Sequence, residues 1–380
     1  MKSKGQYFTK NESLQNKVFE FIKNSPNRIL EPSVGRGDLV LSVRNRIDVP
    51  FDMYEIDNTI DFILDDKYII FGDFLDQNIN IKYKTIIGNP PYVRTKSGNL
   101  YIDFIEKCVS LLEPNGELIF IVPTDFFKLT SARKLLNYMY LHGNFTDIYH
   151  PNNENLFENA SIDIMIFRYC LDDQLTKKTK YNGEELYINN SNGLITFTKE
   201  PCINNYIIGD YFNIYVGLVT GKEEIYKNKE LGNIRLFNDL NCLDKYIFIK
   251  KYPSENEKIN KYLLENKEIL IKRKIRKFND TNWFEWGAPR NIKIMEENYN
   301  EQCIYVRNLT RFETVAFEGK IQYFGGKLLM LKPKKNVNLT NIINYLNSVE
   351  FKSNFSYSGR FKIGQKQLLD SIIPHTIQLD

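Results

Sequence analysis

Apolar positions in the first 170 residues follow two alternating patterns. Short, almost continuously apolar runs rich in β-branched residues predict buried strands, and Tyr83–Gly88 is the clearest example. Apolar residues at helical spacing, such as Leu14, Val18 and Phe21, predict helices between these runs. The predicted strands are 28–31, 51–57, 68–74, 83–88, 117–123, 144–150 and 162–169, and the predicted helices are 13–24, 101–112 and 131–142. Strands alternating with helices predict an α/β fold, a Rossmann-like, doubly wound and mostly parallel sheet covered on both faces.

Residues suited to ligand binding stand at the ends of several predicted strands. Gly35, Glu55, Asp73 and Asn89 each follow or end such a strand. In doubly wound sheets, ligands lie across the carboxyl ends of the strands. We therefore expect one binding site at this edge of the sheet.

The second half of the chain differs from the first in charge. Residues 1–170 hold 19 basic and 22 acidic residues, whereas residues 171–380 hold 32 basic and 25 acidic ones. The polar stretch 172–180 favours a domain boundary, so we predict a first domain at 1–172, a linker region at 173–209 and a second domain of mixed α+β structure at 210–380. Its positive charge, densest at Lys272–Lys277, indicates a polyanionic partner.

Several classes of protein are disfavoured by composition. The five cysteines are scattered without a C-x-x-C pair, which argues against a disulfide framework or a structural zinc site. We predict no metal site, since the three histidines are isolated. The polar first residues and the lack of an apolar run of about 20 residues predict a cytoplasmic protein with no membrane segment.

The stretch Asn89-Pro90-Pro91-Tyr92 follows the clearest strand and forms the strongest candidate for chemistry. Two prolines remove two backbone donors and fix two φ angles, so the corner is stiff and rich in acceptors. An aromatic ring stands beside the Asn89 side chain. Such a corner suits a planar amine, for example the Watson–Crick edge of adenine, although a simple proline-rich turn would have the same sequence.

Taken together, these motifs resemble the adenine-N6 DNA methyltransferases of the γ order. The matching pieces occur in that family's order, and one departure is Lys10, where the family usually has proline. They are Gly5–Thr9, Leu30–Gly37, Glu55–Asp57, Gly72–Phe74 and Asn89–Tyr92. The resemblance implies a catalytic domain that binds S-adenosylmethionine, followed by a target-recognition domain.

Each matching position inherits an expected role from this resemblance. Cofactor-binding residues would be Tyr7 and Thr9 at the methionine part, Glu55 at the ribose, Asp73 and Phe74 at the adenine, with Glu31, Gly35, Gly37 and Pro91 around them. Asn89 and the Pro90 carbonyl would accept hydrogen bonds from N6 of a flipped-out target adenine, and Tyr92 would stack on it. Phe157 is either a second aromatic contact to that base or a core residue at a strand entrance.

The implied partner is double-stranded DNA. We expect phosphate contacts from a basic set in the second half: Lys272, Arg273, Lys274, Arg276, Lys277 and Arg360. Phe278, Trp283, Phe284 and Trp286 follow the basic run and could add shape or base contacts. A monomer working beside a separate restriction endonuclease is the expected organisation. Two alternatives stay open: an RNA or protein-glutamine N-methyltransferase, and a catalytically idle DNA-binding subunit.

Overall fold

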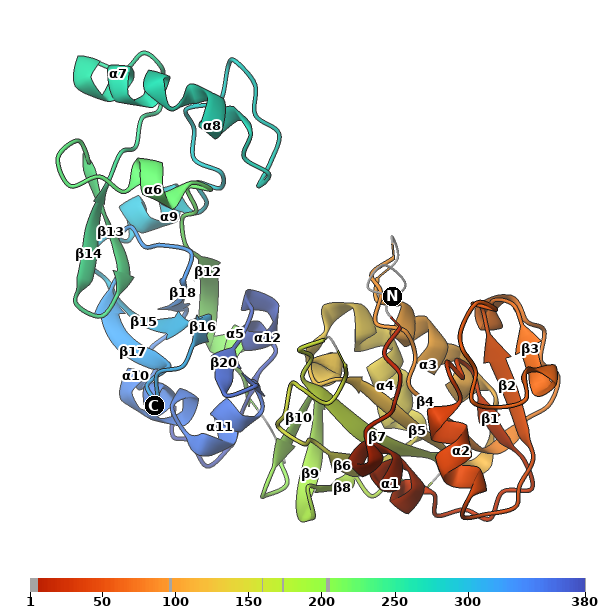
Figure 1. The fold of residues 1–380 in the computed structure, drawn as a ribbon. Helices are drawn as coiled ribbons and strands as arrows, with labels where there is room; N and C mark the ends of the chain where they lie inside the picture. The colour runs from red at the N-terminus through yellow and green to blue at the C-terminus, as the bar shows by residue number, and fades with distance from the viewer. Residues whose placement is uncertain (1–5, 96–97, 159, 173, 203–205, 380) are drawn as a thin grey trace. The chain divides into compact units, whose positions relative to one another are not determined.

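The predicted strands of the first half come together at one large sheet (Figure 1). The structure is a computed structural model that describes residues 6–95, 98–158, 160–172, 174–202 and 206–379. Gly5, the first residue of the amino-terminal motif, lies outside the described residues. The chain divides into two units, Met1–Ile203 with Tyr357–Gly359, and Asn204–Ser356 with Arg360–Asp380.

Within the described residues, the sheet of the first unit has ten strands in the order β10-β9-β8-β6-β7-β5-β4-β1-β2-β3. The strands β3, β2, β1, β4 and β5 pair in parallel, while β7 runs antiparallel between β5 and β6. The strands are β1 (Ile29–Glu31), β2 (Phe51–Glu55), β3 (Ile69–Phe71), β4 (Tyr83–Gly88), β5 (Leu112–Pro123), β6 (Gly143–Tyr149), β7 (Ile164–Leu171), β8 (Lys178–Tyr181), β9 (Glu184–Ser191) and β10 (Leu194–Thr198). The α/β class with a mostly parallel sheet is therefore confirmed, with β7 as a reversed strand inside it.

Helices cover both faces of this sheet. The helices α1 (Glu12–Phe21) and α2 (Asp38–Arg44) bury Leu14, Val18 and Val40 in one core cluster. On the other face, α3 (Leu100–Ser110) and α4 (Arg133–His142) bury Ile105 and Leu136 in a second cluster. The helices α1, α3 and α4 lie where helical spacing predicted them, and α2 follows the glycine-bearing turn after β1.

The predicted linker is wrong for most of its length. Residues 178–198 form β8, β9 and β10, which extend the sheet beyond β6 through a parallel β6–β8 pair. The charged stretch that suggested a linker leads into β8, which lies between β6 and β9 and keeps the Lys180 side chain exposed. Positions 173 and 203–205 of the predicted linker lie outside the described residues.

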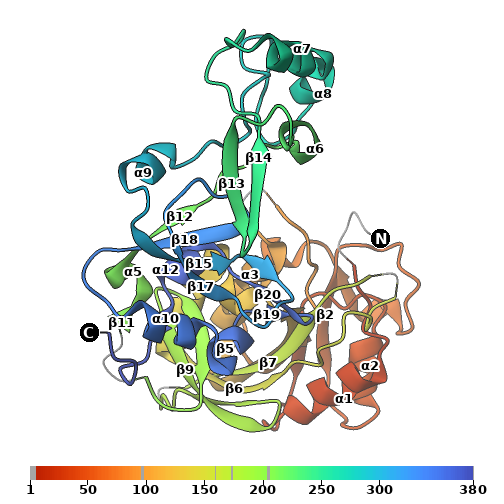
Figure 2. The same cartoon turned by 90° about the vertical axis from the view of Figure 1, so that its left-hand side faces the viewer.

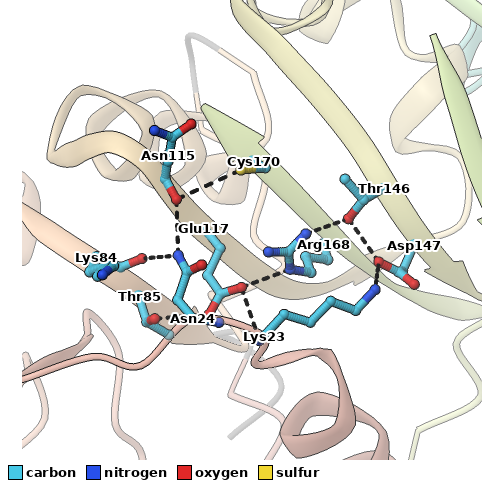
Figure 3. A network of polar contacts seen from close by, with 10 residues as sticks. All are labelled: Lys23, Asn24, Lys84, Thr85, Asn115, Glu117, Thr146, Asp147, Arg168 and Cys170. Carbon is cyan, nitrogen blue, oxygen red and sulfur yellow. Dashed lines mark hydrogen bonds and ion pairs between the residues drawn. The ribbon is translucent and has the colours of Figure 1, made fainter. Parts of the chain in front are cut away.

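A buried ion pair ties α1 to the sheet (Figure 3). Arg168 on β7 donates from Nε to Oε2 of the fully buried Glu117 on β5, at 2.7 Å. The other acceptor positions of Glu117 are filled by the backbone N–H groups of Lys23 and Asn24, just after α1, and by the hydroxyl of Thr85 on β4. Both carboxylate oxygens are thereby satisfied, as a buried charge requires.

The second unit is built on an antiparallel sheet in the order β12-β18-β15-β17. A two-stranded ribbon, β13 with β14, projects from it, and α7 and α8 gather beyond one end of the ribbon (Figure 2). The strands are β11 (Tyr206–Ile207), β12 (Phe212–Val216), β13 (Ile234–Asp239), β14 (Cys242–Tyr246), β15 (Gln302–Arg307), β16 (Leu309–Thr310), β17 (Ala316–Lys320), β18 (Leu328–Pro333), β19 (Ser356–Tyr357), β20 (Arg360–Lys362) and β21 (Ile372–Ile373). The helices are α5 (Ile208–Tyr211), α6 (Glu223–Tyr226), α7 (Glu257–Glu265), α8 (Lys267–Ile271), α9 (Ile292–Glu297), α10 (Leu339–Leu346), α11 (Val349–Ser353) and α12 (Gln365–Leu369).

Candidate active site

A pocket of about 380 Å³ opens at the carboxyl ends of β1, β2, β3 and β4 in the first unit. Gly35, Glu55, Asp73 and Asn89 line it, each supplied by the end of a different strand. This volume falls within the roughly 300–1,000 Å³ common for small-molecule sites. The edge that the strand ends predicted is thus the edge at which the structure places the pocket.

The turn between β1 and α2 needs glycine at two positions. Gly35 has φ +56° and a Cβ there would stand 3.1 Å from the Phe8 ring, so the pocket wall is bare backbone. Gly37 has φ +96°, and a Cβ would lie 2.4 Å from Leu64. Gly37 therefore makes room for Leu64, whereas Gly35 faces the pocket.

Glu55 at the end of β2 organises this turn. Its Oε2 accepts from the Gly35 N–H at 2.9 Å, and Oε1 accepts from the N–H groups of Ile56 and Asp57 at 2.9 and 3.0 Å. An ionised carboxylate has about four acceptor positions, so one stays available to a ligand hydroxyl.

Glu31, at the end of β1, lies deeper than Glu55. It is 2% exposed, and Oε1 accepts from the Ser33 N–H at 3.0 Å. Burial raises the pKa of Glu31 to about 8. The neutral form of Glu31 is therefore favoured at neutral pH, and the side chain supports the pocket from behind Ser33.

The loop after β3 is held by a lysine that sequence reasoning missed. Asp73 caps the turn that follows it, accepting from the Leu75 N–H at 2.9 Å, and Phe74 is buried against Phe104. Lys107 on α3 donates to the carbonyls of Phe74 at 2.5 Å, Leu75 at 3.0 Å and Gln77 at 2.6 Å. No sequence motif marks Lys107, because helix α3 brings it to the loop through tertiary packing alone.

The Asn89 side chain makes hydrogen bonds on both sides of its carboxamide. Nδ2 donates to the Tyr7 carbonyl at 2.7 Å and to Thr9 Oγ1 at 3.1 Å. Oδ1 accepts from the Tyr92 hydroxyl at 2.5 Å. Burial raises the pKa of Tyr92 well above its ordinary value, so the hydroxyl keeps its proton and remains a donor.

Three aromatic rings surround this corner. The Tyr7 ring stacks on Tyr92 with centroids 5.5 Å apart, and Phe157 lies 5.6 Å from Tyr7 and 6.4 Å from Tyr92. Phe157 is buried, with 4% of its surface exposed, and packs in the core cluster of α1 and α2. The structure supports the core interpretation of Phe157, whose ring also lies beside Tyr7 and Tyr92, and contact with a base stays a prediction.

The structure brings only some of the predicted catalytic and cofactor-binding residues into one pocket. Seven predicted residues line it: Tyr7, Gly35, Glu55, Asp73, Phe74, Asn89 and Pro91. Six other predicted residues are not among the described residues that line the pocket: Thr9, Glu31, Gly37, Pro90, Tyr92 and Phe157. Gln6, Phe8, Ser33, Asp57 and Phe104 line the pocket and were not predicted. The first four lie within the matching motifs, so the motifs could have predicted them as pocket residues as well.

The prediction of a phosphate contact is wrong for one residue of the DNA-binding set, Arg273. Arg273 is 7% exposed and donates to three backbone carbonyls, those of Leu270, Thr220 and Trp283, at 2.7, 2.8 and 2.6 Å. A guanidinium enclosed in this way stabilises the loop and has no surface for a phosphate. The remaining members of the set, Lys272, Lys274, Arg276, Lys277 and Arg360, are exposed.

The aromatic residues after the basic run are also placed differently from the prediction. Phe278, Trp283, Phe284 and Trp286 are all buried, and Trp286 donates from Nε1 to the Ile247 carbonyl at 2.8 Å. They form the core under the basic loop, because large apolar rings gain more from burial than from exposure. Contacts to bases would have to come from other side chains.

Among the described residues, no group of His, Cys, Asp and Glu side chains is arranged to hold a metal ion. In the same part of the chain, no helix has the length and apolar character that a bilayer crossing needs.

Comparison with known proteins finds similarity to restriction–modification methyltransferases. Residues 48–157 match the Eco57I restriction-modification methylase family. The type II methyltransferase M.HincII of Haemophilus influenzae is 27% identical over 270 residues, which cover 64% of this chain and 53% of the relative. M.HindII of Haemophilus influenzae strain Rd is 31% identical over 189 residues, 44% of this chain and 36% of the relative. The chain thus matches about half of the first relative's length and about a third of the second's.

A solved structure extends the similarity to both units. The type IIL restriction-modification enzyme MmeI, in complex with DNA, has a TM-score of 0.58 at 10% identity and covers 94% of this chain and 63% of its own. At this identity the likeness concerns the fold alone. The resemblance to restriction–modification methyltransferases and the Rossmann-like methyltransferase fold are both confirmed, and the comparisons support S-adenosylmethionine as the cofactor.

Proposed function

We propose that this protein transfers a methyl group from S-adenosylmethionine to N6 of an adenine in double-stranded DNA, at a specific sequence. The observation that carries the proposal is the Asn89 corner. A carboxamide with a fixed orientation stands between a small-molecule pocket and the rings of Tyr92 and Phe157. Similarity to type II methyltransferases supports the reaction class.

The pocket offers the hydrogen-bond acceptors and the apolar surface that a nucleoside cofactor requires. Carboxylates of Glu55 and Asp73 suit ribose hydroxyls and an exocyclic amine, and the bare backbone at Gly35 allows close approach. Phe74 and Phe104 offer apolar surface for a purine. When bound, S-adenosylmethionine supplies an electrophilic methyl group on a cationic sulfur, which leaves as a neutral thioether.

The Asn89 corner supplies two acceptors for an amino group. Asn89 Oδ1 and the Pro90 carbonyl would each accept one hydrogen of the adenine N6 amine, which concentrates electron density on the nitrogen. The nitrogen forms the new bond to the methyl carbon and gives up one proton to solvent. Tyr92 and Phe157 would hold the base, which has to leave the duplex to reach this site.

The second unit would bind the duplex. Exposed cations at Lys272, Lys274 and Lys277 lie on one loop and can neutralise phosphates. Arg276 on the same loop is exposed but pairs with Glu285, so a phosphate would have to compete with that carboxylate. A cytoplasmic monomer acting beside a separate restriction endonuclease is the organisation we propose with this function.

The experiment that tests this function is transfer of labelled methyl from S-adenosylmethionine to unmethylated duplex DNA, followed by nucleoside analysis. We expect N6-methyladenine at one recurring short sequence. The rate of methyl transfer by the Asn89→Ala variant should fall by a factor of about 10² or more, because the side-chain oxygen that accepts a hydrogen bond from the reacting amine is gone. The affinity for the cofactor should stay unchanged.

Two results would contradict the proposal in different ways. Label on RNA or protein, with none on DNA, would assign the enzyme to another N-methyltransferase class. DNA binding without any transfer would indicate an idle DNA-binding subunit.

A further inference from the structure

The orientation of the Asn89 carboxamide is decided by the segment Tyr7–Thr9. A carboxamide can rotate by half a turn and exchange its oxygen and nitrogen, which reverses its hydrogen-bonding character. The Tyr7 carbonyl can only accept, and it takes the Nδ2 proton at 2.7 Å, so nitrogen faces this segment. Oδ1 then faces the opposite way, where the Tyr92 hydroxyl donates to it.

Thr9 supplies the second contact that holds this orientation. Its Oγ1 lies 3.1 Å from Asn89 Nδ2, so both amide protons have an acceptor on the same segment. Thr9 is 5% exposed and is absent from the described residues that line the pocket. Its hydroxyl contacts Asn89, which does line the pocket.

The position of Thr9 is itself fixed from α1. Gln15, in the first turns of that helix, donates from Nε2 to the Thr9 carbonyl at 2.7 Å. The helix begins at an Asn11 cap, whose Oδ1 accepts from the N–H groups of Ser13 and Leu14. Thr9 is thus a short, rigid connection between a capped helix and Asn89.

We propose that Thr9 is a positioning residue: its hydroxyl holds the Asn89 carboxamide so that Oδ1 is presented to the target amine. This proposal rests on the proposed function and replaces the expected role of Thr9 as a ligand of the methionine part of the cofactor. It also gives the cofactor pocket and the target site a shared segment, since Tyr7 lines the pocket while its carbonyl holds Asn89.

The test compares two variants of the full chain. Thr9→Val keeps the shape and removes the acceptor, so one buried amide proton loses its partner and the carboxamide gains freedom. We expect the single-turnover rate with saturating cofactor to fall about ten- to a hundredfold. Thr9→Ser keeps the hydroxyl and should retain the rate within about threefold.

The dissociation constant of S-adenosylhomocysteine, measured by calorimetry, separates the two roles. A positioning residue leaves it within about twofold in both variants, whereas a ligand of the methionine part would weaken it about tenfold. Ser353→Ala removes an exposed hydroxyl that donates to the Glu350 carbonyl in the second unit, and it serves as the control with unchanged rate and affinity.

Each outcome decides the proposal. A wild-type rate in Thr9→Val, or a cofactor affinity that falls while the rate holds, overturns it. If the valine variant does not fold, Thr9→Ala provides the same comparison against Thr9→Ser. Absence of transfer by the wild-type protein would instead overturn the proposed function itself.

Discussion

Individual residues at the site combine structural and chemical roles. Glu55 fills three of its acceptor positions with the backbone N–H groups of Gly35, Ile56 and Asp57, yet still lines the pocket. Glu31 is enclosed behind Ser33, and its environment favours the neutral acid. Burial is the largest cause of the raised pKa of Glu31, and the nearby charge of Glu55 adds to it.

Glu31 makes a prediction about pH. Its pKa is raised from 4.5 to about 8 in the folded protein, so between these values the folded state holds a proton that the unfolded state has lost. Stability from this group is full below pH 4.5 and is lost as pH rises through 8. For the cofactor-free protein, this loss should amount to a few kcal/mol, on the order of the shift itself.

The Glu31→Gln variant tests this prediction because its side chain is neutral at every pH and keeps an acceptor oxygen for Ser33. Thermal unfolding of both proteins from pH 5.5 to pH 8.5 should show a falling melting temperature for the wild type and a flatter curve for the variant. Parallel curves would mean that Glu31 does not take up the proton on folding.

At the scale of elements, one buried carboxylate joins three strands of the sheet to the end of α1. Glu117 on β5 joins Arg168 on β7, Thr85 on β4 and the end of α1 (Figure 3). The same helix begins beside Thr9, which contacts Asn89. The ion pair therefore anchors one end of a helix whose other end orients the site.

We predict that Glu117→Ala destabilises the protein by about 3–5 kcal/mol, because it leaves Arg168 as an uncompensated buried charge. The double change Glu117→Leu with Arg168→Met should cost clearly less, since no charge is then left unpaired. Urea unfolding measures both. Arg28, which pairs with Asp52 at the surface, is the control: Arg28→Ala should cost no more than about 1 kcal/mol. A double variant less stable than the single one would contradict the argument.

The basic loop of the second unit gives an element-scale prediction about DNA. Lys274→Ala should weaken binding equally at all sequences and lower the salt slope by about one, as loss of one phosphate contact does. Arg273→Ala should instead destabilise the fold by roughly 3 kcal/mol, because three carbonyls lose their charged donor. Filter binding at several salt concentrations and urea unfolding distinguish the two. If Lys274→Ala and Arg273→Ala changed DNA binding and stability by the same amounts, the different exposure of the two side chains would not explain their roles.

At the scale of the whole molecule, charge divides along the boundary between the units. Residues 1–203 hold 23 basic and 27 acidic residues, so residues 204–380 hold 28 basic and 20 acidic ones. Moving the boundary from 170 to 203 makes this division sharper. The pocket unit is slightly acidic, and the unit with the exposed basic loop carries the positive charge.

This division of charge predicts that salt weakens the binding of DNA much more than the binding of S-adenosylhomocysteine. DNA affinity should fall at least about 10²-fold between 50 and 200 mM salt, the effect of roughly four phosphate contacts or more. Affinity for S-adenosylhomocysteine should change by less than about threefold, since its pocket is held by hydrogen bonds and apolar contact. Titrations of both ligands at the two salt concentrations check this; a DNA affinity independent of salt would remove the phosphate-binding role of the second unit.

The sequence by itself determined the approximate positions of strands β1–β7 and of helices α1, α3 and α4 in the first unit, and the edge at which the pocket lies. Buried strands need continuous apolar runs and ligand-binding residues follow strand ends, so both leave local patterns such as 83–88 and Asn89–Tyr92. The tertiary structure alone decided the reversed direction of β7, the β8–β10 extension, the enclosure of Arg273 and the contact of Thr9 with Asn89. Each of these depends on partners distant in sequence, and neither apolar periodicity nor residue type records which partner a side chain meets.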